Sequence, residues 1–328
     1  MPSSPIILTA GDFNPLLADP GYMMGAIDAL ERAMLAEYHG RVRQRVLADE
    51  TTSGEGPPAS LTLNFIGGEG IPNGVTVASS GDGRSSRFVM LFDETTRELV
   101  ALMDAGLFNP VRVGAEGGLG ARHLAPPEAR SLAMLGSGRQ ARTQMAALCN
   151  ALPGLESIKV FSPTREHRES FCSEMSAWLG RNIEPVDSAE AAIRGADIVD
   201  LVNTSHRPIF ELSWIKPGAL VIAITGRGEV PLEFLTGTRV IAPVWSIFSQ
   251  SAVRDPFVAA IKAGTWTRED FGGELGAVIA GDIPARLSPE EIVNFEATAV
   301  PILEHAINVW ACEWARSAGA GTPLNLSA

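Results

Sequence analysis

Short apolar runs alternate with helix-like segments along the chain from residue 131 onward. Such runs predict buried strands, and strands that alternate with helices are typical of a parallel sheet covered by helices. The Ser288-Pro289-Glu290-Glu291 sequence is a helix start signal and predicts a long final helix. Strands are expected at 132–135, 157–161, 183–186, 197–202, 219–224 and 238–241, and helices at 165–179, 188–194, 253–263 and 289–316.

The first part of the chain has a different pattern. Apolar residues recur at helical spacing between Gly21 and His39, and Gly40 ends this stripe. Alternating segments separated by glycine-rich turns predict strands. The expected strands are at 6–8, 61–65, 74–78, 88–92 and 99–103, with a loop at 50–59. This part therefore predicts one helix and a largely antiparallel sheet.

A segment rich in small residues, 109–124, joins the two parts and predicts a helix in spite of its four glycines. The final helix follows the last expected strand, so it can return to the first part of the chain. We therefore predict an α/β fold with two domains. A doubly wound Rossmann domain is expected at 121–303, and a smaller α+β domain at 1–120 plus 304–328.

Composition and charge narrow the class of protein. With 328 residues, of which 45% are hydrophobic and 20% charged, the chain is typical of a globular protein. Its formal net charge of −12 argues against nucleic-acid binding, which needs a basic surface. We expect neither a signal peptide nor a membrane span. The scattered Cys149, Cys172 and Cys312 suit the cytoplasm, and the histidines lack metal-ligand spacing, so no metal site is expected.

The strongest chemical signal is a glycine-rich turn after the first strand of the second part. Gly136-Ser137-Gly138-Arg139-Gln140-Ala141 matches the G-x-G-x-x-G/A dinucleotide fingerprint, between a strand and a helix. Gly136 allows the tight turn, Gly138 lets the backbone approach a pyrophosphate, and Ala141 lets the helix pack close to the strand. Free N–H groups at the helix start then face the anion. The strand at 157–161 completes a βαβ unit, so we predict nucleotide binding.

The end of the second strand predicts which dinucleotide binds. In NAD-binding domains an Asp or Glu there binds the ribose hydroxyls, but this strand is followed by Ser162-Pro163-Thr164-Arg165. Ser162 and Thr164 offer hydroxyl groups to a 2′-phosphate, and Arg165 and Arg168 offer positive charge. We predict NADP(H), with NAD(H) as the second choice; alternatively, Arg165 stacks on the adenine of either. Asn203 and Thr204, which follow the strand at 197–202, complete the predicted contacts.

Several segments share their order and spacing with a known family. They are PIILTAGDFNPLL, LFDETTRELVALMD, VRVGAEGGLGARHLA, GSGRQA, RGADIVDLVNT, LSWIKPGALVIAITG and ARLSPEEIVNFEA. Together they resemble the ornithine cyclodeaminase/mu-crystallin family, over nearly the whole length. The resemblance implies a Rossmann domain and a substrate-binding domain whose sheet forms a homodimer. Family members include cyclodeaminases, alanine dehydrogenases and imino-acid reductases, and one branch binds thyroid hormone without needing catalysis.

The resemblance also implies a substrate site with two arginines and a lysine. Arg45 falls on the position of the first arginine, and Arg112 falls on that of the second. A pair of guanidinium groups is a good carboxylate clamp because each binds through two parallel hydrogen bonds and is always charged. The alternatives are that Arg45 lies on a solvated sheet edge and that Arg112 forms a structural ion pair.

Three departures from the family pattern change the expected activity. Thr76 stands where the family has its lysine, and Arg227 stands where cyclodeaminases have an aspartate. The region of the cyclodeaminase glutamate, 61–64, contains no carboxylate. These losses argue against ornithine cyclodeamination, which needs a general base and an ammonium partner. Arg227 either favours a second substrate carboxylate or pairs with a nearby glutamate. Arg87, in a glycine- and serine-rich loop, could reach the cleft, but we interpret it as solvated.

Our main hypothesis is an NAD(P)H-dependent reductase of an imino or oxo acid with a small carboxylate substrate. The nicotinamide brings the hydride chemistry, so the protein needs only to position the substrate and set the local field. A protonated iminium brings its own proton, so the missing lysine matters less for its reduction. The candidate catalytic residues are Arg112, Arg45, Arg227 and Thr76. The alternative, suggested by the same losses, is a cofactor-bound binding or regulatory protein without turnover.

Overall fold

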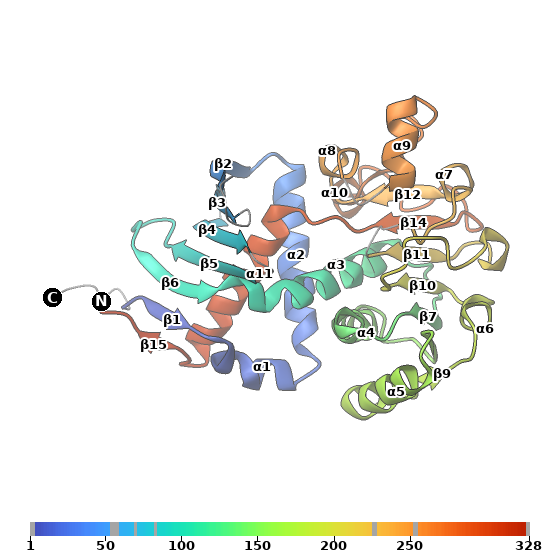
Figure 1. The fold of residues 1–328 in the computed structure, drawn as a ribbon, viewed down its shortest axis with the longest axis horizontal. Coiled ribbons are helices and arrows are strands. Elements are labelled where there is room, and N and C mark those ends of the chain that lie inside the picture. Colours follow the sequence, from blue (N-terminus) through green and yellow to red (C-terminus); the bar gives the residue numbers. More distant parts are fainter. Residues whose placement is uncertain are drawn as a thin grey trace. The chain divides into compact units, whose positions relative to one another are not determined.

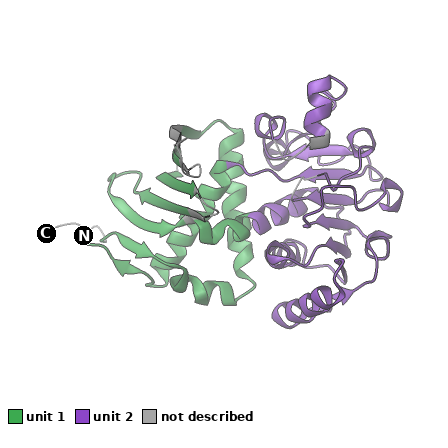
Figure 2. Ribbon diagram, in the orientation of Figure 1, with its two compact units in different colours: residues 1–112, 301–328 green, residues 113–300 purple. Residues whose placement is uncertain are grey.

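The computed structural model describes residues 4–52, 59–68, 71–81, 84–224, 228–251 and 255–325. The chain forms two compact units, which Figure 2 shows in different colours. Unit 1 comprises residues 1–112 and 301–328, and unit 2 comprises residues 113–300. The domain boundaries predicted at 120 and 304 lie close to these positions. They differ at the first boundary because one helix, α3 (Asn109–Leu124), runs across both the predicted and the observed division.

The described strands of unit 1 form one sheet in the order β15-β1-β6-β5-β4-β3-β2. All neighbouring strands are antiparallel except β1 and β6, so the prediction of a largely antiparallel sheet is confirmed. Helices α2 and α11 lie side by side on one face of this sheet (Figure 1). The strands are β1 (Ile6–Leu8), β2 (Val42–Thr52), β3 (Ala59–Gly68), β4 (Ile71–Gly81), β5 (Arg84–Phe92), β6 (Leu99–Asp104) and β15 (Thr322–Pro323). The helices are η1 (Ala10–Phe13), α1 (Asn14–Ala18), α2 (Tyr22–Tyr38), η2 (Ala105–Phe108) and α11 (Pro301–Ser317).

The two faces of this sheet differ sharply because side chains alternate along each strand. On the face that packs against α2 and α11, five apolar side chains are buried: Ile66, Val89, Leu91, Ala101 and Met103. On the opposite face, Leu61 and Phe88 remain 43% and 49% exposed. Apolar neighbours on that face are half-buried, namely Leu63, Phe65, Val75, Val77, Met90 and Leu102. We call the first the inner face and the second the outer face of the unit 1 sheet.

The described strands of unit 2 form a parallel sheet in the order β13-β12-β14-β11-β10-β7-β8-β9. This is the doubly wound sheet that strand–helix alternation predicts. The strands are β7 (Ser131–Leu135), β8 (Ser157–Phe161), β9 (Glu184–Pro185), β10 (Ile198–Leu201), β11 (Leu220–Ala223), β12 (Arg239–Ala242), β13 (Gly273–Glu274) and β14 (Val293–Glu296). The helices are α4 (Arg139–Ala151), α5 (Arg165–Leu179), α6 (Ala189–Ile193), η3 (Leu212–Trp214), α7 (Phe234–Gly237), α8 (Trp245–Phe248), α9 (Asp255–Ala263) and α10 (Leu275–Ala280), besides most of α3.

The helix predicted at 289–316 is wrong over its first part. Residues 293–296 form β14, a fully buried strand between β11 and β12, and the helix begins only at Pro301. The Ser288-Pro289-Glu290-Glu291 signal forms a turn, closed by the N–H of Glu291 on the carbonyl of Ser288 at 3.2 Å. Burial in the centre of a sheet outweighs the local start signal here. The predicted loop at 50–59 is also too long, since β2 continues to Thr52 and β3 begins at Ala59.

Glycines allow α3 to pack closely in unit 2, which explains why this glycine-rich segment is helical. A β-carbon at Gly114 would lie 2.6 Å from the carbonyl oxygen of Thr143 in α4. A β-carbon at Gly120 would overlap the ring of Phe295 in β14. The close approach lets α3 bury apolar surface against α4 and the sheet, which offsets the poor helix propensity of glycine.

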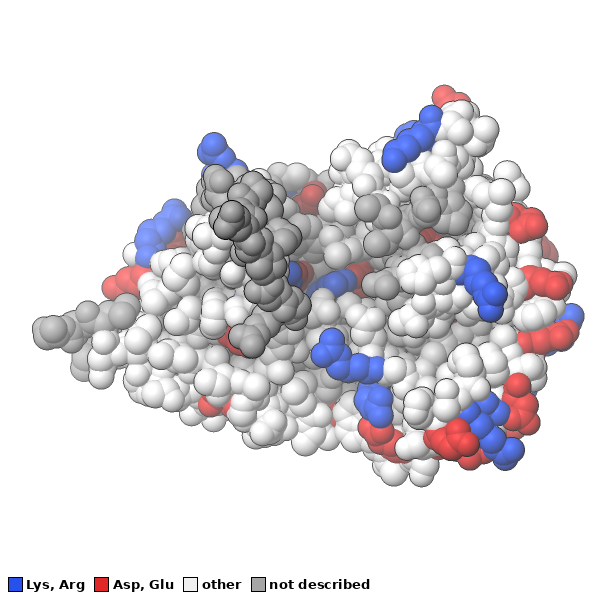
Figure 3. All heavy atoms as spheres, viewed as in Figure 1, with Lys and Arg blue, Asp and Glu red and all other residues white. Residues whose placement is uncertain are grey.

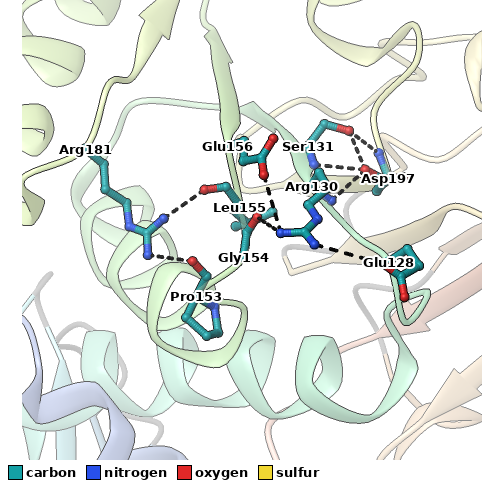
Figure 4. A network of polar contacts seen from close by, with 9 residues as sticks. All are labelled: Glu128, Arg130, Ser131, Pro153, Gly154, Leu155, Glu156, Arg181 and Asp197. Carbon is teal, nitrogen blue, oxygen red and sulfur yellow. Dashed lines mark hydrogen bonds and ion pairs between the residues drawn. The ribbon is translucent and has the colours of Figure 1, made fainter.

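An aspartate joins the amino-terminal ends of two strands in unit 2 (Figure 4). Oδ2 of Asp197, just before β10, accepts hydrogen bonds from the N–H groups of Arg130 and Ser131 at 2.9 Å and from the Ser131 hydroxyl at 2.6 Å. Its Oδ1 pairs with Lys216. Burial alone would raise the pKa of Asp197, but Lys216 and these donors outweigh it and lower the pKa from 3.8 to about 2.

Replacing Asp197 with asparagine is expected to lower the free energy of unfolding by about 2 kcal/mol at pH 7. Because the pKa is lower in the folded protein, the stabilisation is present above about pH 4 and lost as the pH falls toward 2. Urea unfolding of Asp197→Asn and the parent at pH 7 and pH 3 measures this. Glu156→Gln is the matched control, since its pair with Arg130 is long and exposed and should contribute little. A difference that does not shrink at pH 3 would contradict the prediction.

Two surface features bear on possible partners. Among the described residues, no helix combines the length and the apolar character needed to cross a lipid bilayer. Figure 3 shows acidic and basic side chains interspersed on one face of the molecule, so the described part of this face presents no extended basic surface to a polyanion.

Candidate functional site: a dinucleotide turn and a polar pocket

The glycine-rich turn after β7 has the conformation that the fingerprint requires. Gly136 has a φ of 137°, and a β-carbon there would collide with the carbonyl oxygen of Val202, which follows β10. A residue with a side chain is therefore excluded at this position both by conformation and by space. Gly138 is the N-cap of α4 and has open space around its α-carbon. The N–H groups of the first turn of α4 and this open cradle fit the pyrophosphate of a dinucleotide.

Ser137 and Ser162 link the glycine turn to the end of β8. Their hydroxyl oxygens lie 2.9 Å apart, and Ser162 is buried. The guanidinium of Arg168, only 6% exposed, donates to the carbonyl oxygen of Ser162 at 3.2 Å and pairs with Asp187. Arg168 therefore stabilises the connection between β8 and α5, and its positive charge is paired with Asp187.

The other predicted cofactor residues lie at the same carboxyl edge of the sheet, where ligands bind in this class of fold. Thr164 is the N-cap of α5, and Arg165 begins that helix with an exposed side chain paired to Glu169 at 2.7 Å. Arg139 is exposed at the start of α4, and Gln140 follows it, partly buried. After β10, Asn203 accepts a hydrogen bond from the N–H of Ser205 at 2.8 Å, while its side-chain amide nitrogen is buried without a partner among the described residues. Thr204 is exposed.

Unit 1 holds a pocket of about 190 Å³ on the inner face of its sheet, beside the start of α11. Thr76 lies on this pocket and pairs across the sheet with Asn64 and Val89. Most of the inner face is apolar and buried, but the side chains around the pocket are largely polar. The lining residues are Thr62, Asn64, Ile66, Thr76, Ala78, Arg87, Pro301, Glu304 and His305.

The structure does not bring Arg45 and Thr76 together. Arg45 pairs across the sheet with Phe65, so its exposed side chain lies on the outer face, opposite Thr76. Arg112, on α3, is 9% exposed and donates from Nη2 to Oδ1 of Asn109 at 3.2 Å. Arg227 lies outside the described residues.

Two charged residues of this pocket, Arg87 and Glu304, were not among the predicted site residues. Arg87 lies on β5 and not in a loop, and its Nη1 is 2.5 Å from Oε1 of Glu304 in the first turn of α11. The prediction that Arg87 lies in a loop is therefore wrong, and its side chain is paired as well as partly exposed to solvent. The alternation along 86–92 could have placed Arg87 on the same face as the apolar Val89 and Leu91, but its partner lies 217 residues further along the chain.

His305 fixes the start of α11 against β4. Its Nε2 lies 2.7 Å from the carbonyl oxygen of Pro72, so Nε2 carries the proton and donates it. Burial lowers the pKa of His305, although this hydrogen bond opposes the shift, and the ring is therefore neutral at pH 7. Among the described residues, no cluster of His, Cys, Asp or Glu has the arrangement of a metal site.

The doubly wound parallel sheet and its glycine turn define a dinucleotide-binding α/β protein. Residues 26–316 match the family model of the ornithine cyclodeaminase/mu-crystallin family, and the chain belongs to that family. It is 23% identical over 313 residues to an N-((2S)-2-amino-2-carboxyethyl)-L-glutamate dehydrogenase of Staphylococcus aureus, covering 92% of this chain and 93% of the relative. It is 26% identical over 243 residues to a Δ1-pyrroline-2-carboxylate reductase of Bacillus thuringiensis, with 72% and 73% covered.

Solved structures of the family share the fold over nearly the full length. An archaeal alanine dehydrogenase dimer with bound NAD superposes with a TM-score of 0.82 at 23% identity, covering 99% of this chain and 100% of that one. The iminosuccinate reductase of Paracoccus denitrificans in complex with NAD⁺ gives 0.81 at 23% identity, with 98% and 100% covered. These similarities confirm the predicted fold class.

Proposed function

We propose that the protein is an NAD(P)H-dependent reductase of an imino acid, which also works in reverse as a dehydrogenase. The observation that carries the proposal is the turn at Gly136, whose conformation and open surroundings at Gly138 fit a dinucleotide. Membership of the family supports it, since relatives across the family are named as reductases or dehydrogenases of imino and amino acids.

The residues of this chain bind and orient the reactants. A bound nicotinamide supplies the hydride, and unit 2 holds the dinucleotide through the turn at 136–138 and the first turn of α4. Arg112 binds the carboxylate of the substrate, with its guanidinium oriented by Asn109. Thr76 offers a hydroxyl group but no charge, so the iminium nitrogen must arrive protonated.

The absorbance of reduced nicotinamide tests this function directly. The purified protein is mixed with NADPH or NADH and with cyclic imino acids, or with oxo acids in the presence and absence of amines. We expect oxidation of the cofactor with at least one imino acid and with oxo acids only when an amine is present. Cofactor binding without turnover on any of them would instead favour a binding or regulatory protein.

NADP(H) is the proposed cofactor, in preference to NAD(H). No carboxylate ends β8, and Arg165 forms an exposed pair with Glu169, which costs little to break. Arg165→Ala is expected to weaken NADPH binding about ten- to a hundredfold, the value of one charge-assisted hydrogen bond, and NADH binding much less. Titration of both cofactors by fluorescence measures this, with Arg194→Ala, from a similar exposed helix pair, as the control. Equal affinity of the parent protein for NADPH and NADH would refute the preference.

A homodimer formed through the outer face of the unit 1 sheet is the proposed assembly. Leu61 and Phe88 are exposed there among half-buried apolar neighbours, and such a patch marks an association surface. Light scattering should give twice the chain mass of 34.7 kDa. Phe88→Asp should shift the protein toward the monomer, whereas Leu232→Asp, at a still more exposed leucine of unit 2, should not. A monomer at micromolar concentration for the parent protein would contradict the assembly.

We also place the protein in the cytoplasm. Cys149, Cys172 and Cys312 are free and buried, and burial raises the pKa of each thiol to about 11. Such cysteines act as small apolar core residues and not as disulfide partners, which suits a reducing compartment.

A further inference from the structure

The polar pocket of unit 1 contains a paired positive and negative charge that no role in the proposed reduction uses. Arg87 and Glu304 come from β5 and α11, and their side chains are 41% and 27% exposed. Both line the pocket that contains Thr76 and Asn64. Ion pairs with this exposure contribute little to stability, so each partner can exchange the other for a ligand at small cost.

The surroundings of this pair are those of a binding pocket and not of a core. The same sheet face is apolar and buried at Val89, Leu91 and Met103, where it packs against helices. Around the pocket it carries hydroxyl, amide, guanidinium and carboxylate groups instead. Binding pockets place a few polar groups around an open volume, so the concentration of such groups here points to a polar ligand.

The pocket also borders the carboxylate-binding region of the proposed site. Arg87 and Ala78 line both the pocket of about 190 Å³ and a second pocket of about 420 Å³. The second pocket reaches Asn109, whose side chain accepts a hydrogen bond from Arg112. Arg87 therefore lies on the wall of a pocket that also reaches the hydrogen-bond partner of Arg112, and all of these residues belong to unit 1.

We propose that Arg87 and Glu304 bind an α-amino-acid group on the substrate, Arg87 its carboxylate and Glu304 its ammonium. This inference rests on the proposed function and narrows its substrates to imines whose nitrogen substituent carries an amino-acid group of its own. The paired charges are matched by a neutral zwitterion, which forms two charge-assisted hydrogen bonds. We call this nitrogen substituent the arm of the substrate. An arm with only a carboxylate is repelled by the negative charge of Glu304, and an arm with only an amine is repelled by the positive charge of Arg87, so both bind more weakly.

Three glutamate derivatives that differ only in the arm test the proposal. They are N-((2S)-2-amino-2-carboxyethyl)-L-glutamate, N-(2-carboxyethyl)-L-glutamate and N-(2-aminoethyl)-L-glutamate. Calorimetry with the protein saturated with oxidised cofactor should show the first binding at least tenfold tighter than either of the others. Arg87→Gln should weaken the first compound about 10- to 100-fold. Glu304→Gln should reverse the order, so that the arm with only a carboxylate binds best.

A purely structural pair would not produce that reversal. Arg87→Lys, which keeps the charge, should retain part of the affinity. Arg194→Gln, from an exposed pair in unit 2, should leave the ratios unchanged, and thermal unfolding checks that each variant is folded. Equal affinities for the three compounds, or no binding of any, would overturn the inference. Reduction of NADP⁺ or NAD⁺ by the first compound, measured in parallel, reports on the proposed function separately, since selective binding without turnover would leave the pocket assignment standing.

Discussion

Arg112→Ala is expected to lower kcat/KM for the imino-acid substrate at least about thirtyfold, which corresponds to a loss of about 2–5 kcal/mol of transition-state stabilisation. Arg112 as a whole is only 9% exposed, so its charge acts in a partly desolvated setting where attraction to a carboxylate is stronger than in water. Asn109 holds it from one helical turn earlier on α3, which fixes the direction of the fork. Steady-state kinetics in the reductive direction measures the loss.

The substitution series at Arg112 separates charge from geometry. Arg112→Lys keeps the charge but loses the two parallel hydrogen bonds, so it should fall between the parent and Arg112→Ala. Titration of the dinucleotide should give nearly the parent's affinity for both variants, because no part of the dinucleotide turn is altered. If Arg112→Ala kept the parent's kcat/KM, the carboxylate role would be wrong and the buried guanidinium would be structural.

Much of the fold follows from local patterns. The helix at 165–179 begins and ends where the sequence predicts, because apolar spacing and a glycine after Leu179 determine it locally. The helix at 109–124 also has its predicted bounds, although it depends on close packing against α4 and β14. The strand at 293–296 could not be found this way. Its two apolar residues, Val293 and Phe295, alternate with Asn294 and Glu296 as in a half-exposed strand, whereas in the structure all four are buried in the interior of the unit 2 sheet, between β11 and β12.

The candidate site likewise has one part that the sequence predicts and one part that it does not. The dinucleotide turn is a contiguous motif whose chemistry depends on backbone conformation, so the sequence alone predicts it at Gly136 and Gly138. The polar pocket instead brings together residues of β3, β4, β5 and α11. Arg87 meets Glu304 only through the return of the last helix to unit 1, and alternation places Arg45 on the opposite sheet face from Thr76. Neither the contact between Arg87 and Glu304 nor the placement of Arg45 and Thr76 on opposite faces can be predicted from the spacing of residues within one segment.

Asp200→Val is expected to stabilise the protein by about 2–4 kcal/mol at pH 7, against the usual direction of core substitutions. Asp200 lies in β10 between Met134 and Ile222 of the neighbouring strands and is fully buried. Neither of its carboxyl oxygens has a hydrogen-bond partner among the described residues. Burial raises the pKa of Asp200 from 3.8 to about 8. The folded protein therefore retains a proton that the unfolded chain releases.

The pH dependence of this effect identifies its cause. Because the folded state binds more protons than the unfolded state between about pH 4 and pH 8, the parent protein loses stability as the pH rises through this range. Asp200→Val lacks this slope and adds apolar contact in a strand, where a β-branched side chain fits. Asp200→Asn is the matched control, since it also abolishes the titration but still buries an unpaired polar group, and so should gain less. Urea unfolding at pH 5 and pH 8 measures both variants, and a gain that stays the same at the two pH values would show that the carboxyl group ionises normally in the folded protein.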